Sequence, residues 1–183
     1  MNTIITSKEE ILKHSRELLQ KKGWNAINIR ALATACHVSV GSIYNYFPSK
    51  AELVSETIAS VWLEIFHQPD ESFQTIEACV RWMFERMRYA QTAYPGFFTL
   101  HAFSFAKPEK SEGKKRMEET WTHMEASLCA ILHSDPNIRP DAFNARLSEK
   151  QFAHVLFSLM MSAWLRHDFD PDVVLEIVRR TVY

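Results

Sequence analysis

The spacing of apolar positions divides most of the chain into helices. Apolar residues recur at three- and four-residue intervals within segments that begin at capping residues and end at Gly, Pro or charged residues. The long segments cover about residues 8–22, 50–66, 72–92, 113–133, 141–166 and 171–182, with a short apolar helix at 97–105. No segment shows the two-residue alternation of a strand. With two short helices before residue 50, the pattern predicts an all-α fold of about nine helices.

Two short helices separated by a break are expected within residues 28–47. Asn28 and Ser39 are residue types that cap helix N-termini, so one helix follows each of them. Small and hydrogen-bonding residues near the start of the second helix lie off its apolar face. This division is typical of a helix-turn-helix motif, whose second helix enters the major groove. The expected inward-facing residues of the pair are Leu32, Ala33, Cys36, Ile43 and Phe47.

The run Val38-Ser-x-Gly-Ser-Ile-Tyr-x-Tyr-Phe-x-x-Lys-x-x-Leu53 resembles the signature of the tetracycline-repressor (TetR) family of bacterial transcription regulators. The resemblance covers roughly residues 7–66. His37 stands where the family usually has Gly in the turn, and Asn28 stands where it has Thr. His is enriched among residues that accept the left-handed conformation, so the turn is compatible with it. The resemblance implies a three-helix DNA-binding domain at 1–49 and a helical effector-binding and dimerisation bundle at 50–183.

The same resemblance, with side-chain chemistry, selects candidate DNA contacts. Tyr44 and Tyr46 are alternatively core aromatics, but Ile43 and Phe47 already occupy the core face. The residues expected at the DNA backbone are Asn28, Ser39, Tyr44, Tyr46 and Lys50. Those expected at base edges are Arg30, Val40, Gly41, Ser42 and Asn45.

Charge is distributed unevenly along the 183 residues. Residues 1–50 hold seven Lys and Arg against three Glu, a net +4, whereas the whole chain has a net charge of −1. A basic N-terminal segment on an acidic body fits a small DNA-reading domain joined to a separate ligand or partner domain. The chain also lacks a long apolar run and a signal-peptide pattern at its N-terminus, so we expect a cytoplasmic protein.

Enzyme, metal and cofactor functions find little support in the sequence. The four glycines form no phosphate-binding loop and no nucleophile elbow. Cys129 and His133 are four residues apart on one helix, but no further ligand follows at a metal-site spacing. We therefore expect no catalytic site, metal or cofactor, and we expect the three cysteines to be reduced core thiols.

The C-terminal domain is rich in aromatic residues, which suggests a pocket for an apolar or aromatic effector. The alternative is that these aromatics only fill the core. The family resemblance favours a pocket, because its members generally bind a small effector that lowers DNA affinity. The candidate pocket residues are Trp62, Phe66, Trp82, Arg86, Phe98, Phe103, Trp121 and Phe157.

The last two predicted helices, 141–166 and 171–182, carry more apolar surface than one core contact requires. Within 152–165 the apolar residues form two stripes, and either could face a second copy of the chain. Both stripes could also be internal. The candidate dimer residues are Phe152, Val155, Leu156, Leu159, Met160, Ala163, Val174 and Val178.

Together these features predict a homodimeric regulator that binds double-stranded DNA at a palindromic operator. In proteins similar to this one such binding usually represses transcription and is released by a small molecule. The alternative is a helix-turn-helix protein without an effector, acting through a protein partner or structurally.

Overall fold

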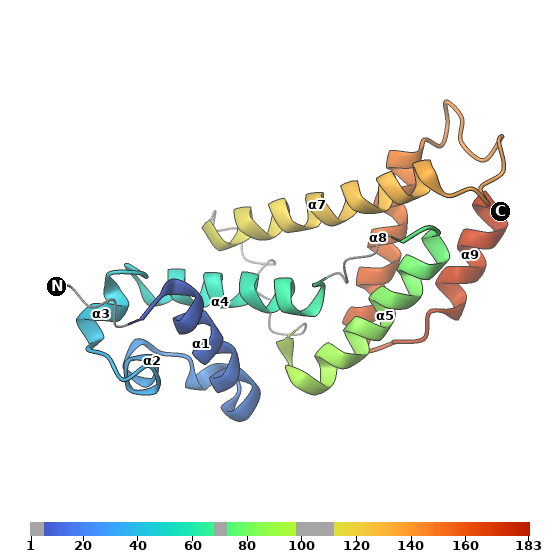
Figure 1. The fold of residues 1–183 in the computed structure, drawn as a ribbon. Helices are drawn as coiled ribbons and strands as arrows, with labels where there is room; N and C mark the ends of the chain where they lie inside the picture. Colours follow the sequence, from blue (N-terminus) through green and yellow to red (C-terminus); the bar gives the residue numbers. More distant parts are fainter. Residues whose placement is uncertain (1–5, 68–72, 98–111) are drawn as a thin grey trace.

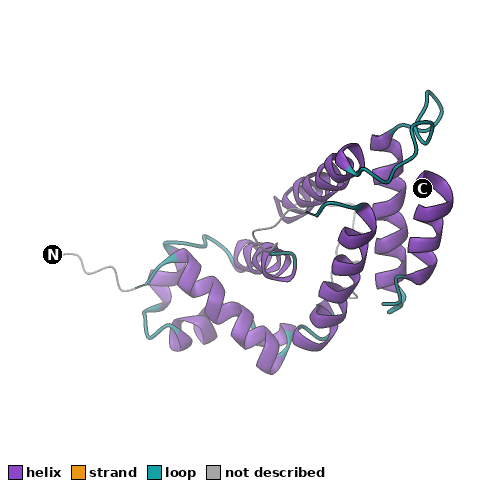
Figure 2. Ribbon diagram, turned by 45° about the vertical axis from the view of Figure 1, so that its right-hand side comes forward, coloured by secondary structure: helices purple, strands orange, loops and turns teal. Residues whose placement is uncertain are grey.

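The computed structural model describes residues 6–67, 73–97 and 112–183. Within these ranges it contains α-helices, one short 3-10 helix and no strand, which confirms the all-α prediction (Figures 1 and 2). The predicted helix at 97–105 lies, apart from Phe97, outside the described residues. The elements are α1 (Lys8–Lys22), η1 (Trp24–Ala26), α2 (Ile29–Ala35), α3 (Val40–Tyr44), α4 (Lys50–Ile65), α5 (Ile76–Ala93), α7 (Glu112–Ser134), α8 (Glu149–Leu165) and α9 (Asp172–Val182).

Side-chain caps determine where most of these helices begin. The hydroxyls of Ser7 and Ser49 each accept the backbone N–H three residues later, at 3.1 Å, and so start α1 and α4 at the predicted residues. The predicted start of α8 near residue 141 is wrong, because Ser148 and Gln151 form a reciprocal capping box that begins the helix at Glu149. The residues before it form tight turns instead.

The helices form two groups joined by α4. In Figure 1, α1 to α3 lie at the N-terminal end, and α5, α8 and α9 lie at the end that carries the C-terminus. Helix α4 runs from the first group toward the second, with α7 along its length. We call residues 6–49 the head and residues 50–183 the body. Helix α4 also packs on α1, where the buried hydroxyls of Ser15 and Thr57 lie 2.7 Å apart.

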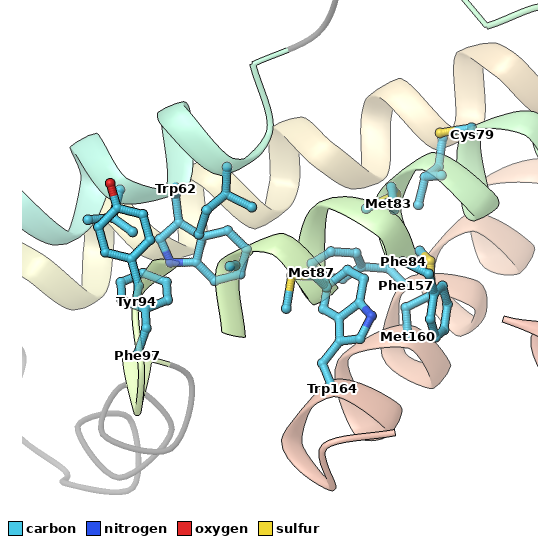
Figure 3. Close-up of a cluster of buried hydrophobic side chains, with 14 of the residues drawn as sticks. Trp62, Cys79, Met83, Phe84, Met87, Tyr94, Phe97, Phe157, Met160 and Trp164 are labelled. Atoms are coloured by element: carbon cyan, nitrogen blue, oxygen red, sulfur yellow. The ribbon is translucent and has the colours of Figure 1, made fainter. Parts of the chain in front are cut away.

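The body core is built around large aromatic and sulfur-containing side chains (Figure 3). Trp164 of α8 is fully buried and packs edge-on against Phe84 of α5. Helix α8 contacts α7 and α9, so most of its apolar surface is covered within the chain.

This packing buries most of the residues predicted for the dimer interface. Six of the predicted dimer residues are buried in the chain's own core. They are Phe152, Leu156, Met160, Ala163, Val174 and Val178. In the second stripe Phe157 and Trp164 are also buried, whereas Leu165 is 43% exposed. Val155 remains 47% exposed and Leu159 is half-buried. The sequence pattern could not distinguish a helix covered on two sides by its own chain from a helix covered by a partner.

Candidate nucleic-acid interface and body cavity

Two backbone hydrogen bonds stabilise the turn between α2 and α3 at His37. Its backbone has a φ of +54°, the left-handed conformation expected from the sequence. The N–H of Val38 donates to the carbonyl of Ala33 at 2.9 Å, and the N–H of His37 donates to the carbonyl of Thr34 at 3.2 Å. These two bonds are those of a Schellman motif, which ends α2 and turns the chain sharply into α3.

The inner face of α3 is fixed to the rest of the head. Ile43 and Phe47 are fully buried and belong to the same hydrophobic core as Leu32 and Ala33 of α2, the helix on which α3 packs. Ser39 caps the helix by accepting the N–H of Ser42 at 3.1 Å. The short helix is therefore held on one face, and its other side chains are left for the surface.

The outer face of α3 carries predicted contacts to base edges and, at Tyr44, to the DNA backbone. Val40 is 39% exposed and Tyr44 is 48% exposed, and Gly41 and Asn45 are exposed beside them. A Cβ added at Gly41 would meet only the Ser39 hydroxyl, at 3.7 Å, an ordinary contact. The head itself therefore does not need glycine here. A glycine inside a helix costs about 1 kcal/mol relative to alanine, so its use suggests close approach by something outside the chain.

The other predicted DNA contacts differ in how free their polar groups are. Arg30 and Lys50 are exposed, Lys50 at the first turn of α4. The Asn28 side chain caps α2, accepting from Ala31 at 2.9 Å and donating to the carbonyl of Ala26 at 3.2 Å. The Tyr46 hydroxyl donates its only proton to the carbonyl of Thr6 at 2.7 Å, so in this structure that proton is not available to a phosphate.

A cavity of about 510 Å³ lies in the body between α4, α5 and α7. Helices α4 and α5 supply mainly aromatic and sulfur-containing walls, and Figure 3 shows Trp62, Cys79 and Met83 among them. Helix α7 supplies Thr120, His123 and Ser127 along one face. The described lining is Trp62, Leu63, Phe66, His67, Cys79, Trp82, Met83, Thr120, His123, Met124, Ser127 and Leu128, and these residues include no Asp, Glu, Lys or Arg.

Comparison with known proteins assigns the head to a family. Residues 11–57 match the model of the bacterial regulatory proteins of the tetR family. The head therefore carries the sequence pattern of that family. The chain is 38% identical over 52 residues to the HTH-type transcriptional repressor KstR of Rhodococcus jostii and 32% identical over 65 residues to KstR of Mycobacterium tuberculosis. These matches cover 28% and 36% of this chain but only 24% and 30% of the two repressors.

Solved structures extend the likeness of fold over the whole chain. A TetR transcriptional regulator from Legionella pneumophila aligns over 100% of both chains with a TM-score of 0.60 and 21% identity. BioQ, solved with its double-stranded DNA operator, aligns over 89% of this chain and 86% of BioQ, with a TM-score of 0.57 and 15% identity. The likeness of fold to these structures therefore continues through the body.

In the body the predicted effector residues fall into three groups. Trp62, Phe66 and Trp82 line the cavity. Trp121 and Phe157 do not line it; they pack edge-on against each other between α7 and α8, 6.2 Å apart. Phe98 and Phe103 lie outside the described residues.

Arg86, the charged member of that prediction, also does not line the cavity. Its guanidinium donates to the backbone carbonyls of Glu64 and Ile65 at the end of α4, and stacks on Tyr89 with its centre 4.6 Å from the ring. Sequence reasoning also missed the α7 wall. Its signal was the spacing of Thr120, His123 and Ser127, which places three polar side chains beside the apolar stripe of that helix.

Within the described residues no group of His, Cys, Asp and Glu side chains is arranged to hold a metal ion, and no helix is long and apolar enough to cross a membrane.

Burial changes the acidity of a cysteine in the cavity wall. Cys79 is 4% exposed, and its removal from water raises the thiol pKa to about 12, because the apolar surroundings disfavour the thiolate. Burial also raises the pKa of the Cys36 thiol in the head, with smaller contributions from Glu10 and Glu17. The Cys79 thiol is therefore expected to be unreactive in the folded protein.

This pKa predicts a loss of stability in alkali. The unfolded thiol releases its proton near pH 9, while the folded Cys79 keeps it to about 12, so the folded state binds the extra proton in between. The stabilisation is fully present below pH 9 and falls by about 1.4 kcal/mol per pH unit above it. Urea unfolding in reducing buffer at pH 8, 9 and 10 measures this effect. The free energy of unfolding should fall less steeply with pH for Cys79→Ala than for wild type. Cys129→Ala is the matched control, and an unchanged slope in Cys79→Ala would contradict the prediction.

Proposed function

We propose that this chain is a DNA-binding transcription regulator, and that it acts as a repressor. The observation that carries the proposal is the division of α3, with one face buried in a TetR-family head and the other presenting Val40, Gly41, Tyr44 and Asn45 to the surface. Small and hydrogen-bonding groups on an exposed short helix suit base edges in the major groove. That both KstR relatives are repressors supports the direction of regulation.

The residues around α3 suit contacts to the phosphate backbone. The Tyr44 hydroxyl lies on the exposed face, and Lys50 stands at the first turn of α4, where free backbone N–H groups favour an anion. Ser39 and Asn28 contribute mainly by capping α3 and α2, and so fix the position of the helices that approach the DNA. Arg30 suits guanine, and Asn45 suits adenine.

We propose that a small effector binds the body cavity. Its volume of about 510 Å³ lies in the range of small-molecule sites. The walls suit a flat, apolar and uncharged molecule, because Trp62 and Phe66 stack 5.4 Å apart and the described lining carries no charged carboxylate, ammonium or guanidinium. Ser127 donates to the carbonyl of His123 at 3.0 Å, so its oxygen remains able to accept a bond from a polar group on the edge of the ligand.

We propose a two-fold homodimer built on the exposed sides of α8 and α9. The apolar residues that remain on the surface there and support it are Val155, Leu165 and Val173, which are 47%, 43% and 72% exposed. Two heads related by symmetry would read the two halves of a palindromic operator. We place the protein in the cytoplasm, where bacterial DNA is accessible, and take the end of the head at Ser49 as the domain boundary.

Selection of bound duplexes from a random DNA pool tests the function. We expect enrichment of a palindromic sequence whose half-sites are separated by about one helical turn. Affinity should fall steeply between 50 and 200 mM salt, because bound phosphates release counterions. Recovery of no preferred sequence, with binding that remains weak on every duplex, would reject the proposal.

The competing function is a DNA-binding protein without an effector. It predicts the same enrichment, but no saturable binding of a small apolar molecule in the cavity. Thermal stabilisation by uncharged aromatic compounds, followed by measurement of operator affinity, distinguishes the two functions.

A further inference from the structure

Four side chains and two backbone carbonyls form a set of hydrogen bonds at the C-terminal end of α4. The Glu64 carboxylate accepts from Nε of Arg16 in α1 at 2.6 Å and from the hydroxyl of Tyr94, just after α5, at 2.6 Å. Arg86 of α5 donates to the carbonyl of Glu64 at 3.1 Å and to that of Ile65. We call Arg16, Glu64, Arg86 and Tyr94 the Glu64 junction. It joins a head helix, the connecting helix and a body helix in one set of hydrogen bonds.

The contacts of the Glu64 junction are partly shielded from water. The side chains of Arg16 and Glu64 are 23% and 34% exposed, and Tyr94 is almost completely buried. Burial and the hydrogen bond to Glu64 together raise the pKa of the Tyr94 hydroxyl, which therefore keeps its proton and acts as the donor. A charged pair held by a third, buried group has a defined geometry that a fully exposed pair lacks.

The same turn of α4 forms a wall of the cavity. Trp62, Phe66 and His67 line it, and Glu64 lies between them in sequence. Each residue of an α-helix advances by about 100°, so Glu64 projects roughly opposite to both Trp62 and Phe66. The side of this turn that lines the cavity is therefore opposite to the side that pairs with Arg16.

We infer that the Glu64 junction transmits occupancy of the cavity to the head. In the absence of ligand it holds α1 and the end of α4 in one arrangement. A molecule against Trp62 and Phe66 shifts the last turn of α4, so the Arg16–Glu64 contact differs between the bound and free states. Coupling requires such a difference in free energy between two states. Glu64 is thus a positioning residue for the head, and this inference rests on the proposed effector and DNA functions.

An aromatic contact in the same region also links the cavity wall to the head, and so offers an alternative to the Glu64 junction. Phe97 packs on Trp24 of the head, with ring centres 5.8 Å apart, and on Trp62 of the cavity wall at the same distance. Figure 3 shows Trp62, Tyr94 and Phe97 close together. The experiment must therefore separate the polar junction from this aromatic contact.

The test measures operator affinity with and without N-phenyl-1-naphthylamine, an uncharged aromatic fluorophore, on the duplex recovered from the random pool. Wild type should show a change of about 5- to 150-fold, the usual range of allosteric coupling. Glu64→Gln keeps the shape of the side chain but loses the charge that pairs with Arg16, and its coupling should fall to about 3-fold or less. Operator and probe affinities measured separately should change little.

Glu56→Gln is the matched control. Glu56 also lies on α4 and pairs with a head cation, Lys8, at 3.0 Å, but it does not line the cavity. It should keep the full coupling factor. Ser127→Trp fills the cavity and should abolish probe binding, whereas Ala126→Trp, on the neighbouring exposed position of α7, should not.

Arg16→Gln and the double variant with Glu64→Gln complete a cycle. If the pair acts as a unit, the double variant should lose no more coupling than either single variant. If Glu64→Gln loses helicity, Arg16→Gln provides the test in its place. Wild-type coupling in Glu64→Gln or Arg16→Gln would overturn the inference and favour the Phe97 contact. Probe bound in the wild-type cavity with no effect on operator affinity would also overturn it, whereas failure to select any operator would reject the proposed function itself.

Discussion

Alanine at Tyr44 or Lys50 is expected to weaken binding to every duplex, whereas alanine at Arg30 or Asn45 is expected to weaken binding and also relax base preference. The first two residues present a hydroxyl and an ammonium group suited to phosphate, which carries no sequence information. The other two present groups that can pair with base edges, at about 1–3 kcal/mol per good contact. All four side chains belong to exposed residues, so the folded head should be retained.

Binding isotherms on the selected operator and on a scrambled duplex, each at several salt concentrations, measure these effects. Lys50→Ala should reduce the salt slope by about one. Tyr44→Phe removes only the exposed hydroxyl, and Tyr46→Phe is its control, because the Tyr46 hydroxyl bonds within the head to Thr6. Equal losses on operator and scrambled DNA for all four alanine variants would contradict this division of roles.

Gly41→Ala provides an independent check on the same surface. The added Cβ fits within the head and should stabilise α3 by up to about 1 kcal/mol. It also projects from the face that we assign to DNA. Stability and operator affinity should therefore change in opposite directions, and an affinity that stays constant would show that DNA does not approach Gly41 closely.

A charge on the exposed side of α8 or α9 is expected to convert the dimer to monomers and to abolish tight operator binding. Val155→Asp and Val173→Asp place a carboxylate on surface that the chain leaves in water but that we assign to a second copy. Burial of an unpaired charge opposes association. A monomer reads one half-site and loses the gain from linked binding, which is on the order of 10²–10⁴ in affinity.

Light scattering at micromolar concentration and operator titration should report the two losses together. Lys150→Asp adds a negative charge at an exposed position on α8, off the face of Val155, and should leave the dimer intact. Val174 is unsuitable for this test because it is buried, and a charge there would unfold the body. A monomeric wild type with full helicity would falsify the proposed dimer.

Local interactions explain what the sequence alone determined. Ser7, Asn28, Ser39 and Ser49 each accept a backbone N–H within three residues, so the beginnings of α1, α2, α3 and α4 depend on neighbours in sequence. The left-handed turn at His37 is likewise closed by bonds to the preceding helix. For this reason the helix-turn-helix, its buried Ile43 and Phe47, and its exposed face were all predictable.

Only the tertiary structure decided which apolar faces meet each other. The periodicity of α8 defined two stripes, but contacts within the body bury most of the first stripe and Phe157 and Trp164 of the second, and leave Val155 and Leu165 exposed. In the same way, the sequence made Arg86 a reasonable candidate for binding an effector. In the structure its guanidinium instead donates to the backbone carbonyls at the end of α4. The Glu64 junction depends on residues 16, 64, 86 and 94 coming together, and the cavity wall on α7 depends on residues 120–128 facing α4 and α5. Periodicity within one helix carries no information about its partners.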